Sequence, residues 1–310
     1  MMTVSFVIPT IGRSQELKSL LASFTRQTVK PNEIIIVDQG DKRDVDWKTE
    51  FANLPIQIYS VDFRSLTKAR NFGVSKSSGD IVGFLDDDIV LGGDYVKNIL
   101  QCFTGHQQAL GVQGLITNFE ATHTAKVGGN GLVYRAYNLF AKIFLLNNSS
   151  RTNKLLWSGR NQYASRVDKM IGCEWLSGIG NYRRKVFEEF TFDENLVGYA
   201  LGEDKLFSFP ISEKYPGSLF LDPTIKCEHH HADGGRPQSR AWVEMKIDYT
   251  YYLWDKLFRE KGILAVAAYW WANLGDLLVV FFSLILGKNS LSFFWWHAIG
   301  YWKILWRKTV

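Results

Sequence analysis

Short apolar runs alternate with amphipathic segments through the first hundred residues of the chain. The strand-like runs are Val4–Pro9, Glu33–Asp38, Ile56–Ser60 and Ile81–Asp86, and the helix-like segments are Glu16–Phe24 and Leu66–Ser75. Continuous β-branched runs separated by helices are typical of a parallel sheet that is covered on both faces. Right-handed crossovers then place the carboxyl ends of the strands along one edge of the sheet.

The remainder of the chain has a different pattern. Residues from about 114 to 240 are irregular and rich in glycine and aromatics, and a helix with an apolar stripe is expected at Ala241–Glu260. Six of the eleven tryptophans lie between Trp270 and Trp306. We therefore expect three parts: residues 1–115 and 116–240 as two portions of one α/β core, and residues 241–310 as a helical, aromatic-rich extension.

Composition excludes several classes of protein. Of the 310 residues, 22% are charged, the net charge is +5, and basic residues form no long block, so nucleic acid is not an expected partner. Cys102, Cys173 and Cys227 are far apart and form no CxxC pair, which indicates a reducing compartment without disulfides. The N-terminal MMTVSFVIPT reads as a first strand and not as a signal peptide, so we expect a cytoplasmic protein.

Polar residues follow three of the predicted strands. Their carboxyl ends carry Pro9-Thr10, Asp38-Gln39-Gly40 and Asp86-Asp87-Asp88. Ligands of open α/β sheets bind at this edge. The rim formed by these three clusters is therefore the predicted site.

The three consecutive aspartates at this rim repel one another unless a cation lies between them. In an extended chain Asp86 and Asp88 point to the same side and Asp87 points away. Two carboxylates with open coordination positions suit Mg²⁺ or Mn²⁺. The alternative is a solvated turn that caps a helix.

The segment KARNFGVSKSSGDIVGFLDDD (68–88) resembles the nucleotide-sugar segment of family 2 glycosyltransferases of the GT-A type. FVIPT and IIIVDQG match the first two strands of that family, although VDQG replaces the usual VDDGS. WLSGIGNYRRKVFEEFTFDENLVGYALGEDKLF (175–207) is similar to its acceptor segment, and the resemblance covers about residues 3–240. It implies a GT-A, Rossmann-like α/β fold with a mostly parallel central sheet flanked by helices, here followed by the C-terminal extension.

The resemblance also implies roles for the residues of the rim. Asp88 would bind a divalent metal, Mn²⁺ or Mg²⁺, that bridges the donor diphosphate. The residues expected to bind the nucleotide-sugar are Pro9, Thr10, Asp38, Arg70, Asp86 and Asp87. Among these, Asp38 would accept a hydrogen bond from the base, and Asp86 would contact the ribose side.

The histidine cluster CEHHHADGGR (227–236) follows at the point where the family often completes its metal shell with a histidine. His229 fits that spacing best, His231 shares its face, and His230 points away. An exposed loop without metal is the alternative. The residues after the cluster resemble a loop that closes over the diphosphate, with Arg236 or Arg240 as phosphate contacts.

Sugar transfer also requires a base that takes the proton of the acceptor hydroxyl. In the Glu-Asp motif of the family the second acid is usually that base, which implies Asp204 here, with Glu203 in a supporting or acceptor-binding role. As bare sequence, such a pair more often caps a helix N-terminus. The acceptor pocket would be lined by the WLSG segment, namely Trp175, Ser177 and Gly178, although a core tryptophan is equally expected at Trp175.

The aromatic C-terminus predicts contact with a membrane. The stretch from Ile263 to Leu286 carries one charge, Asp276, and as a helix it measures about 36 Å, enough to cross a bilayer core. Positive residues flank it on both sides, which favours a re-entrant or interfacial helix pair over a single crossing. Contact between copies of the chain is the competing interpretation.

The resemblance implies an inverting, metal-dependent glycosyltransferase, and the aromatic C-terminus predicts that it works at the cytosolic face of a membrane. The donor would be a UDP-, GDP- or dTDP-sugar, and the acceptor a hydroxyl of a glycan or of a lipid-linked acceptor. A polyprenyl-phosphate sugar transferase is the alternative within the enzyme class. From another class, the chain could be a non-catalytic nucleotide-binding scaffold at a membrane.

Overall fold

A computed structural model describes residues 2–40, 46–118, 131–147, 152–164, 167–197, 200–230 and 239–306. The chain divides into two compact units. Residues 1–126 and 165–232 form one, which we call the sheet unit, and residues 127–164 and 233–310 form the other, the helical unit. Residues 127–164 thus join the C-terminal helices, an association that the division expected at 115 and 240 does not contain.

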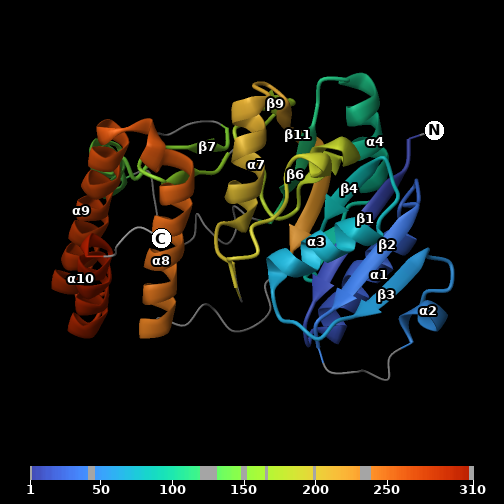
Figure 1. The fold of residues 1–310 in the computed structure, drawn as a ribbon, viewed down its shortest axis with the longest axis horizontal. Helices are drawn as coiled ribbons and strands as arrows, with labels where there is room; N and C mark the ends of the chain where they lie inside the picture. Colours follow the sequence, from blue (N-terminus) through green and yellow to red (C-terminus); the bar gives the residue numbers. More distant parts are fainter. Residues whose placement is uncertain are drawn as a thin grey trace. The chain divides into compact units, whose positions relative to one another are not determined.

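The sheet unit is built on a sheet of nine described strands with the order β3-β2-β1-β4-β10-β6-β11-β5, and β9 pairs with β11. The strands are β1 (Val4–Thr10), β2 (Glu33–Asp38), β3 (Ile56–Ser60), β4 (Ile81–Phe84), β5 (Ile89–Leu91), β6 (Gly111–Ile116), β9 (Ile171–Gly172), β10 (Asn181–Arg183) and β11 (Leu219–His229). The first four in space are parallel, as predicted from their β-branched runs. Figure 1 shows these strands side by side, with helices around them.

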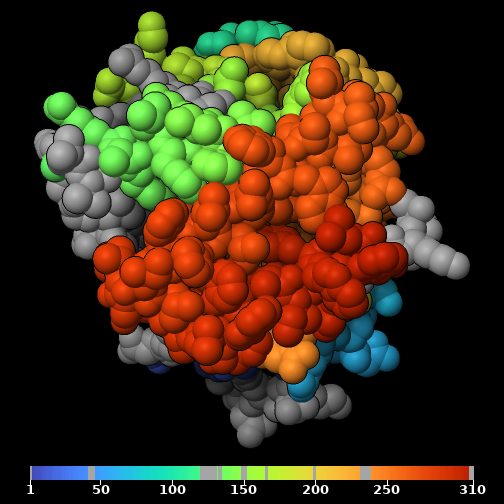
Figure 2. Space-filling view, turned by 90° about the vertical axis from the view of Figure 1, so that its left-hand side faces the viewer, coloured from blue at the N-terminus to red at the C-terminus, as the bar shows by residue number. Residues whose placement is uncertain are grey.

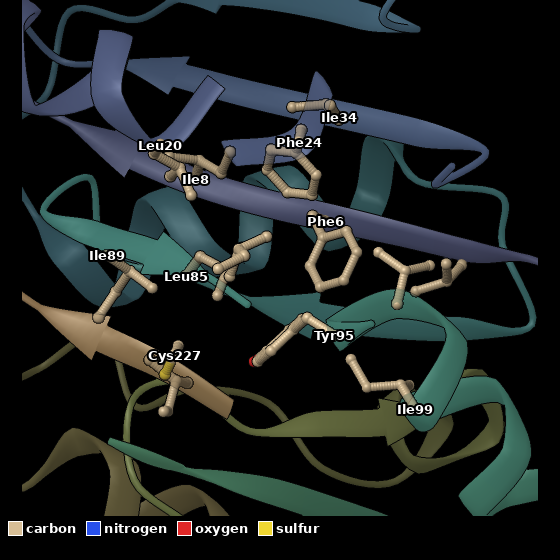
Figure 3. Close-up of a cluster of buried hydrophobic side chains, with 14 of the residues drawn as sticks. Phe6, Ile8, Leu20, Phe24, Ile34, Leu85, Ile89, Tyr95, Ile99 and Cys227 are labelled. Carbon is tan, nitrogen blue, oxygen red and sulfur yellow. The ribbon is translucent and has the colours of Figure 1, made fainter. Parts of the chain in front are cut away.

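Helices cover both faces of the parallel strands. They are α1 (Ser14–Thr25), α2 (Trp47–Glu50), α3 (Leu66–Lys76), α4 (Tyr95–Gly105), η2 (Arg184–Glu188) and α7 (Glu203–Lys214). Side chains alternate between the two faces of the sheet along each strand, so a strand of this sheet can pack against helices on both sides. On β2, Ile34 and Ile36 pack in the cluster with α1 and α4, whereas Ile35 and Val37 pack with α3. Figure 3 shows the first cluster, where Phe6 lies between Phe24 and Tyr95.

The short strand β10 interrupts the parallel order, because it lies antiparallel between β4 and β6. Asn181 of β10 pairs with Gly83 of β4, and a Cβ atom at Gly83 would lie 2.4 Å from the Asn181 Oδ1 atom. The glycine therefore permits the close approach of the two strands. The sheet is mixed but mostly parallel, which confirms the predicted fold class.

The helical unit contains α6 (Leu132–Ile143), the short strands β7 (Lys154–Leu155) and β8 (Asn161–Gln162), α8 (Arg240–Phe258), η3 (Arg259–Lys261), α9 (Ile263–Ile285) and α10 (Leu291–Leu305). Aromatic contacts join its segments: the ring centroids of Phe144 and Trp271 are 4.7 Å apart, and those of Trp254 and Tyr269 are 4.4 Å apart. Asp276 on α9 lies 4.0 Å from the Arg160 Nη2 atom and accepts a hydrogen bond from Tyr301. The charge in this apolar helix is thus paired inside the unit.

The surface that α9 and α10 form on the helical unit is rich in apolar side chains. Figure 2 shows α9 and α10 covering much of the face of this unit, beside the segments of 131–147 and 152–164. The exposed large side chains of α9 and α10 include Trp271, Leu274, Phe281, Phe282, Ile285, Leu291, Trp295, Ile299, Trp302 and Leu305. Among the described residues, α9 alone is long and apolar enough to cross a bilayer, judged by length and composition, and 33% of an 18-residue apolar stretch within it is buried.

Candidate active site

The rim at the carboxyl ends of the parallel strands brings the predicted polar clusters together. Thr10 at the end of β1 is in register with Asp38 at the end of β2. Val7 of β1 pairs with Phe84, the last residue of β4, so the aspartates that follow Phe84 emerge at the same edge. This placement follows from the parallel pairing, which aligns the strand ends.

Asp86, Asp88 and His229 form a group at this rim. One ligand atom from each lies within 4.8 Å of those of the other two. The Asp88 Oδ1 atom is 3.0 Å from the His229 Nε2 atom. Two carboxylates and an imidazole are a donor set that fits Mn²⁺, and the carboxylates also fit Mg²⁺. The group could therefore hold a divalent cation.

Strand pairing explains how His229 reaches the aspartates. β11 runs antiparallel to β5, and His229 pairs with Ile89, the residue after Asp88. The backbone N–H of His230 donates to the Asp88 carbonyl at 2.9 Å. The side chain of Asn118 fixes the backbone of His229 by accepting from its N–H and donating to its carbonyl. The other predicted ligand, His231, lies outside the described residues.

Asp87, the middle aspartate, is held by Thr10 at the end of β1 and by Arg13 just after it. It is buried, accepts a hydrogen bond from the Thr10 hydroxyl at 2.8 Å, and accepts another from Arg13 at 3.1 Å. Burial raises the pKa of the Asp87 carboxyl to about 6, although Thr10 and Arg13 oppose the rise. The same Arg13 nitrogen lies 3.5 Å from Asp88. Sequence reasoning missed Arg13, whose only signal was its position just after β1.

Gln39, the residue at which VDQG departs from the family pattern, makes hydrogen bonds at the rim. Gln39 accepts a hydrogen bond through Oε1 from the backbone N–H of Ser65 at 2.7 Å, just before α3 begins. The backbone N–H of Gln39 donates to the Thr10 carbonyl. Asp38 accepts from the N–H of Gly40 at 2.9 Å. Gln39 thus ties the rim to the start of α3, while the predicted base contact by Asp38, like the role of the buried Pro9, stays a prediction.

Arg70 on α3 is the most buried charged residue of the site, with 1% of its surface exposed. Its guanidinium lies 3.2 Å from Asp86 and 2.7 Å from Glu203, and it donates a hydrogen bond to the Gly178 carbonyl at 3.2 Å. The rings of Phe84 and Phe192 flank it at 5.5 and 5.4 Å. Arg70 therefore connects the donor segment with the segment predicted to bind the acceptor.

The two acids of the Glu-Asp motif begin helix α7 and have separate partners. Burial raises the pKa of the Glu203 carboxyl, and the Arg70 guanidinium opposes that rise. Asp204 is paired with Lys205, whose Nζ atom lies 2.9 Å from the Asp204 Oδ1 atom. The residue before them, Gly202, has a φ of +92°, a conformation that favours glycine. Both carboxylates are largely shielded from solvent, with 8% of the Glu203 side chain and 12% of the Asp204 side chain exposed.

The WLSG segment is tied into the sheet unit. Trp175 is fully buried, and the Lys205 ammonium lies over its ring at 4.5 Å. The N–H of Ser177 donates to Gln113 at 2.5 Å, and the Gly178 carbonyl accepts from Arg70. The described structure therefore covers the tryptophan face that we expected to meet a sugar. The acceptor-binding role of this segment stays a prediction.

Two predicted phosphate contacts remain untested. Arg236 lies outside the described residues. Arg240 is the exposed first residue of α8 in the helical unit and pairs with Glu244 at 3.1 Å. Its role toward a donor phosphate stays a prediction.

Comparison with known sequences agrees with the site geometry. Residues 5–159 match the family described as "Glycosyl transferase family 2". The chain is 41% identical over 88 residues, 28% of this chain and 33% of the relative, to the uncharacterized glycosyltransferase YwdF of Bacillus subtilis. It is 27% identical over 251 residues, 78% of this chain and 32% of the relative, to the glycosyltransferase GlyA of Streptococcus pneumoniae. These matches thus span about a third of the length of those curated relatives.

Comparison with solved structures supports the fold. The crystal structure of GalNAc-T7 with UDP, GalNAc and Mn²⁺ matches with a TM-score of 0.55 and 14% identity, covering 89% of this chain and 55% of that chain. At this identity the likeness concerns the fold. The family match at residues 5–159 includes the triple aspartate but ends before Glu203 and Asp204.

Proposed function

The chain belongs to glycosyltransferase family 2, and on that premise we propose that it transfers a sugar from a nucleoside-diphosphate sugar to a hydroxyl of a glycan or lipid-linked acceptor. The observation that carries the proposal is the group of Asp86, Asp88 and His229 at the rim that also bears Thr10 and Asp38. The UDP and Mn²⁺ bound by the structural neighbour GalNAc-T7 support this choice of donor and cation.

Asp86, Asp88 and His229 are the residues that would hold the divalent cation, Mn²⁺ or Mg²⁺. When bound, this cation neutralises the charge that develops on the leaving diphosphate. Thr10 and Asp38 lie beside each other at the ends of β1 and β2, where they can receive the base and ribose. Arg13 would add a cationic contact near the phosphates, since 44% of its side chain is exposed at this rim.

Asp204 is the proposed base that removes the proton from the acceptor hydroxyl. Lys205 holds the Asp204 Oδ1 atom, which fixes the orientation of the carboxylate. A single base without a nucleophile fits an inverting transfer, in which the hydroxyl attacks the anomeric carbon directly.

We further propose that the helical unit binds the cytosolic face of a membrane. Support comes from the exposed tryptophan, phenylalanine and leucine side chains of α9 and α10 and from the exposed Lys288 between these helices. Aromatic residues combined with lysine are typical of interfacial helices. Because Asp276 pairs with Arg160 and accepts a hydrogen bond from Tyr301, its charge has partners within the unit. The same surface favours a polyprenyl-phosphate acceptor as the second candidate substrate.

The donor is tested by thermal stabilisation with a panel of UDP-, GDP- and dTDP-sugars, each with Mn²⁺ and with EDTA. The proposal expects one nucleotide class to raise the melting temperature in the presence of Mn²⁺ and to lose that effect in EDTA. Hydrolysis or transfer of the sugar then separates an enzyme from a nucleotide-binding scaffold. A complete lack of stabilisation by every donor with Mn²⁺ would contradict the proposal.

A further inference from the structure

The guanidinium of Arg70 lies between two carboxylates that differ in depth. Glu203 is 2.7 Å from Nη1, and 8% of its side chain is exposed. Asp86 is 3.2 Å from Nη2, and 37% of its side chain is exposed. Glu203 is thus the closer and less exposed partner of Arg70. Asp86, the more exposed partner, belongs to the candidate metal group.

A buried guanidinium requires a counter-charge, because an unpaired charge away from water is strongly unfavourable. Arg70 remains charged at all accessible pH values. If Glu203 did not supply the negative charge, Asp86 would be the carboxylate left in contact with Arg70. It would then have to neutralise the guanidinium and bind a divalent cation at the same time.

Packing around the guanidinium holds Arg70 between Glu203 and Asp86. Phe84 and Phe192 flank the guanidinium. The Gly178 carbonyl accepts from Nη2, and a Cβ atom at Gly178 would lie 2.9 Å from that nitrogen. The guanidinium is therefore enclosed on the side of the WLSG segment as well. Its position is set by packing and not only by its charge partners.

We propose that Glu203 is a positioning residue of the donor site: in its ionised form, which the Arg70 guanidinium 2.7 Å away favours, it neutralises Arg70 and so keeps Asp86 available to the divalent cation. This inference rests on the proposed function. The sequence led us to expect a supporting or acceptor-binding role for Glu203, and the inference assigns the supporting role to the donor site. Glu203 does not touch the cation in this account and acts through Arg70.

The test is a titration of the full chain with Mn²⁺ alone, in which electron paramagnetic resonance measures the free and bound Mn²⁺. Glu203→Gln keeps the side-chain size but leaves Arg70 uncompensated, so the Mn²⁺ dissociation constant should rise about ten-fold. Asp204→Asn is the matched control, because it removes one charge at the adjacent residue, where the partner is Lys205. Its Mn²⁺ affinity should stay within about two-fold of wild type.

A double variant distinguishes the loss of charge compensation from a general disturbance of the site. The double variant Arg70→Met/Glu203→Gln removes both charges together, and its Mn²⁺ affinity should return to within about three-fold of wild type. Melting curves identify folded variants. If Glu203→Gln is unfolded, Glu203→Asp gives the same reading, since its shorter side chain draws the charge away from Arg70 and should weaken Mn²⁺ binding.

Two different failures can be told apart. Equal Mn²⁺ affinities of folded Glu203→Gln and Asp204→Asn, or a folded double variant as weak as Glu203→Gln, would overturn the positioning role alone. If the wild-type chain binds no Mn²⁺, with or without UDP, the proposed metal site itself is wrong and the inference is overturned with it.

Discussion

The carboxylate of Asp88 and the imidazole of His229 are 3.0 Å apart, although the two residues are distant in the sequence. Burial alone would lower the pKa of His229, but the hydrogen bond and the charge of Asp88 outweigh burial and raise it. The pair is therefore stabilised when His229 carries its proton. A divalent cation requires the neutral imidazole and so competes with that proton.

This competition predicts a pH dependence of metal binding. Because the pKa of His229 is raised above its ordinary value of about 6.5, Mn²⁺ affinity should fall as the pH drops from 8 to 6. In the His229→Gln variant, affinity at pH 8 should be lower and should change less over this range. The measurement is a Mn²⁺ titration at several pH values. A wild-type affinity that is constant over this range would contradict the role of His229.

Asp88→Asn should abolish metal-dependent donor binding while leaving the fold intact. The substitution removes an anionic ligand but retains the volume, and loss of a ligand should cost at least about ten-fold in metal affinity. The measurement is nucleotide binding with and without Mn²⁺. Asp168→Asn, an exposed acid of the sheet unit, is the control and should bind like wild type. An unchanged Mn²⁺ requirement in Asp88→Asn would show that the metal assignment is wrong.

Asp204→Asn should bind the donor and lose turnover, because it removes the proton acceptor. Loss of a general base typically lowers the rate by about 10²–10⁴-fold. Donor affinity and kcat are measured separately on the same preparation. Wild-type turnover in this variant would exclude the role, and a larger loss of kcat at unchanged Mn²⁺ affinity in Glu203→Gln would transfer it to Glu203.

The apolar surface of the helical unit predicts binding to lipid vesicles. The full chain should float with vesicles that contain anionic lipid, and salt should weaken interfacial binding, since each nearby lysine or arginine contributes about 1 kcal/mol. Trp295→Ser/Trp302→Ser removes two exposed side chains of α10 and should reduce the floating fraction. Val29→Ser/Val197→Ser changes exposed apolar residues of the sheet unit and should float like wild type. A wild-type chain that stays at the bottom of the gradient would favour self-association as the use of this surface.

The half-buried pair of Asp276 and Arg160 predicts a stability effect with a defined sign. Despite burial, which raises it, the pKa of Asp276 is lowered to about 2 by Arg160 and its other partners. A lowered pKa in the folded state stabilises the fold above pH ~4, and that contribution is lost as the pH falls toward ~2. The shift corresponds to about 2 kcal/mol.

Asp276→Asn should therefore be less stable than wild type at pH 7, and the difference should shrink as the pH approaches 2. Chemical denaturation in detergent at several pH values measures it. Glu260→Gln, an exposed carboxylate of the same unit, is the control and should show little change. A stability difference that stays constant down to pH 2 would contradict the ion pair.

The local elements could be predicted from the sequence, since each depends on nearby residues. The runs at Glu33–Asp38 and Ile56–Ser60 form strands with the predicted bounds, and Leu66–Lys76 is helical as expected. The convergence of Thr10, Asp38 and the triple aspartate also followed from the sequence, because parallel strands joined by right-handed crossovers end at one edge. The family resemblance rested on these same local motifs.

The connections between distant segments could not be predicted in this way. The pairing of Glu203 with Arg70, the contact of Arg13 with Asp87 and the burial of Trp175 depend on how separate segments pack. Local pattern contains no information on which cation a buried carboxylate meets, because desolvation and distance are set by the whole fold. The sequence by itself therefore determined the strands, the edge and the candidate chemistry. Only the tertiary structure decided the partner of each charge, since close packing brings those charges within contact distance.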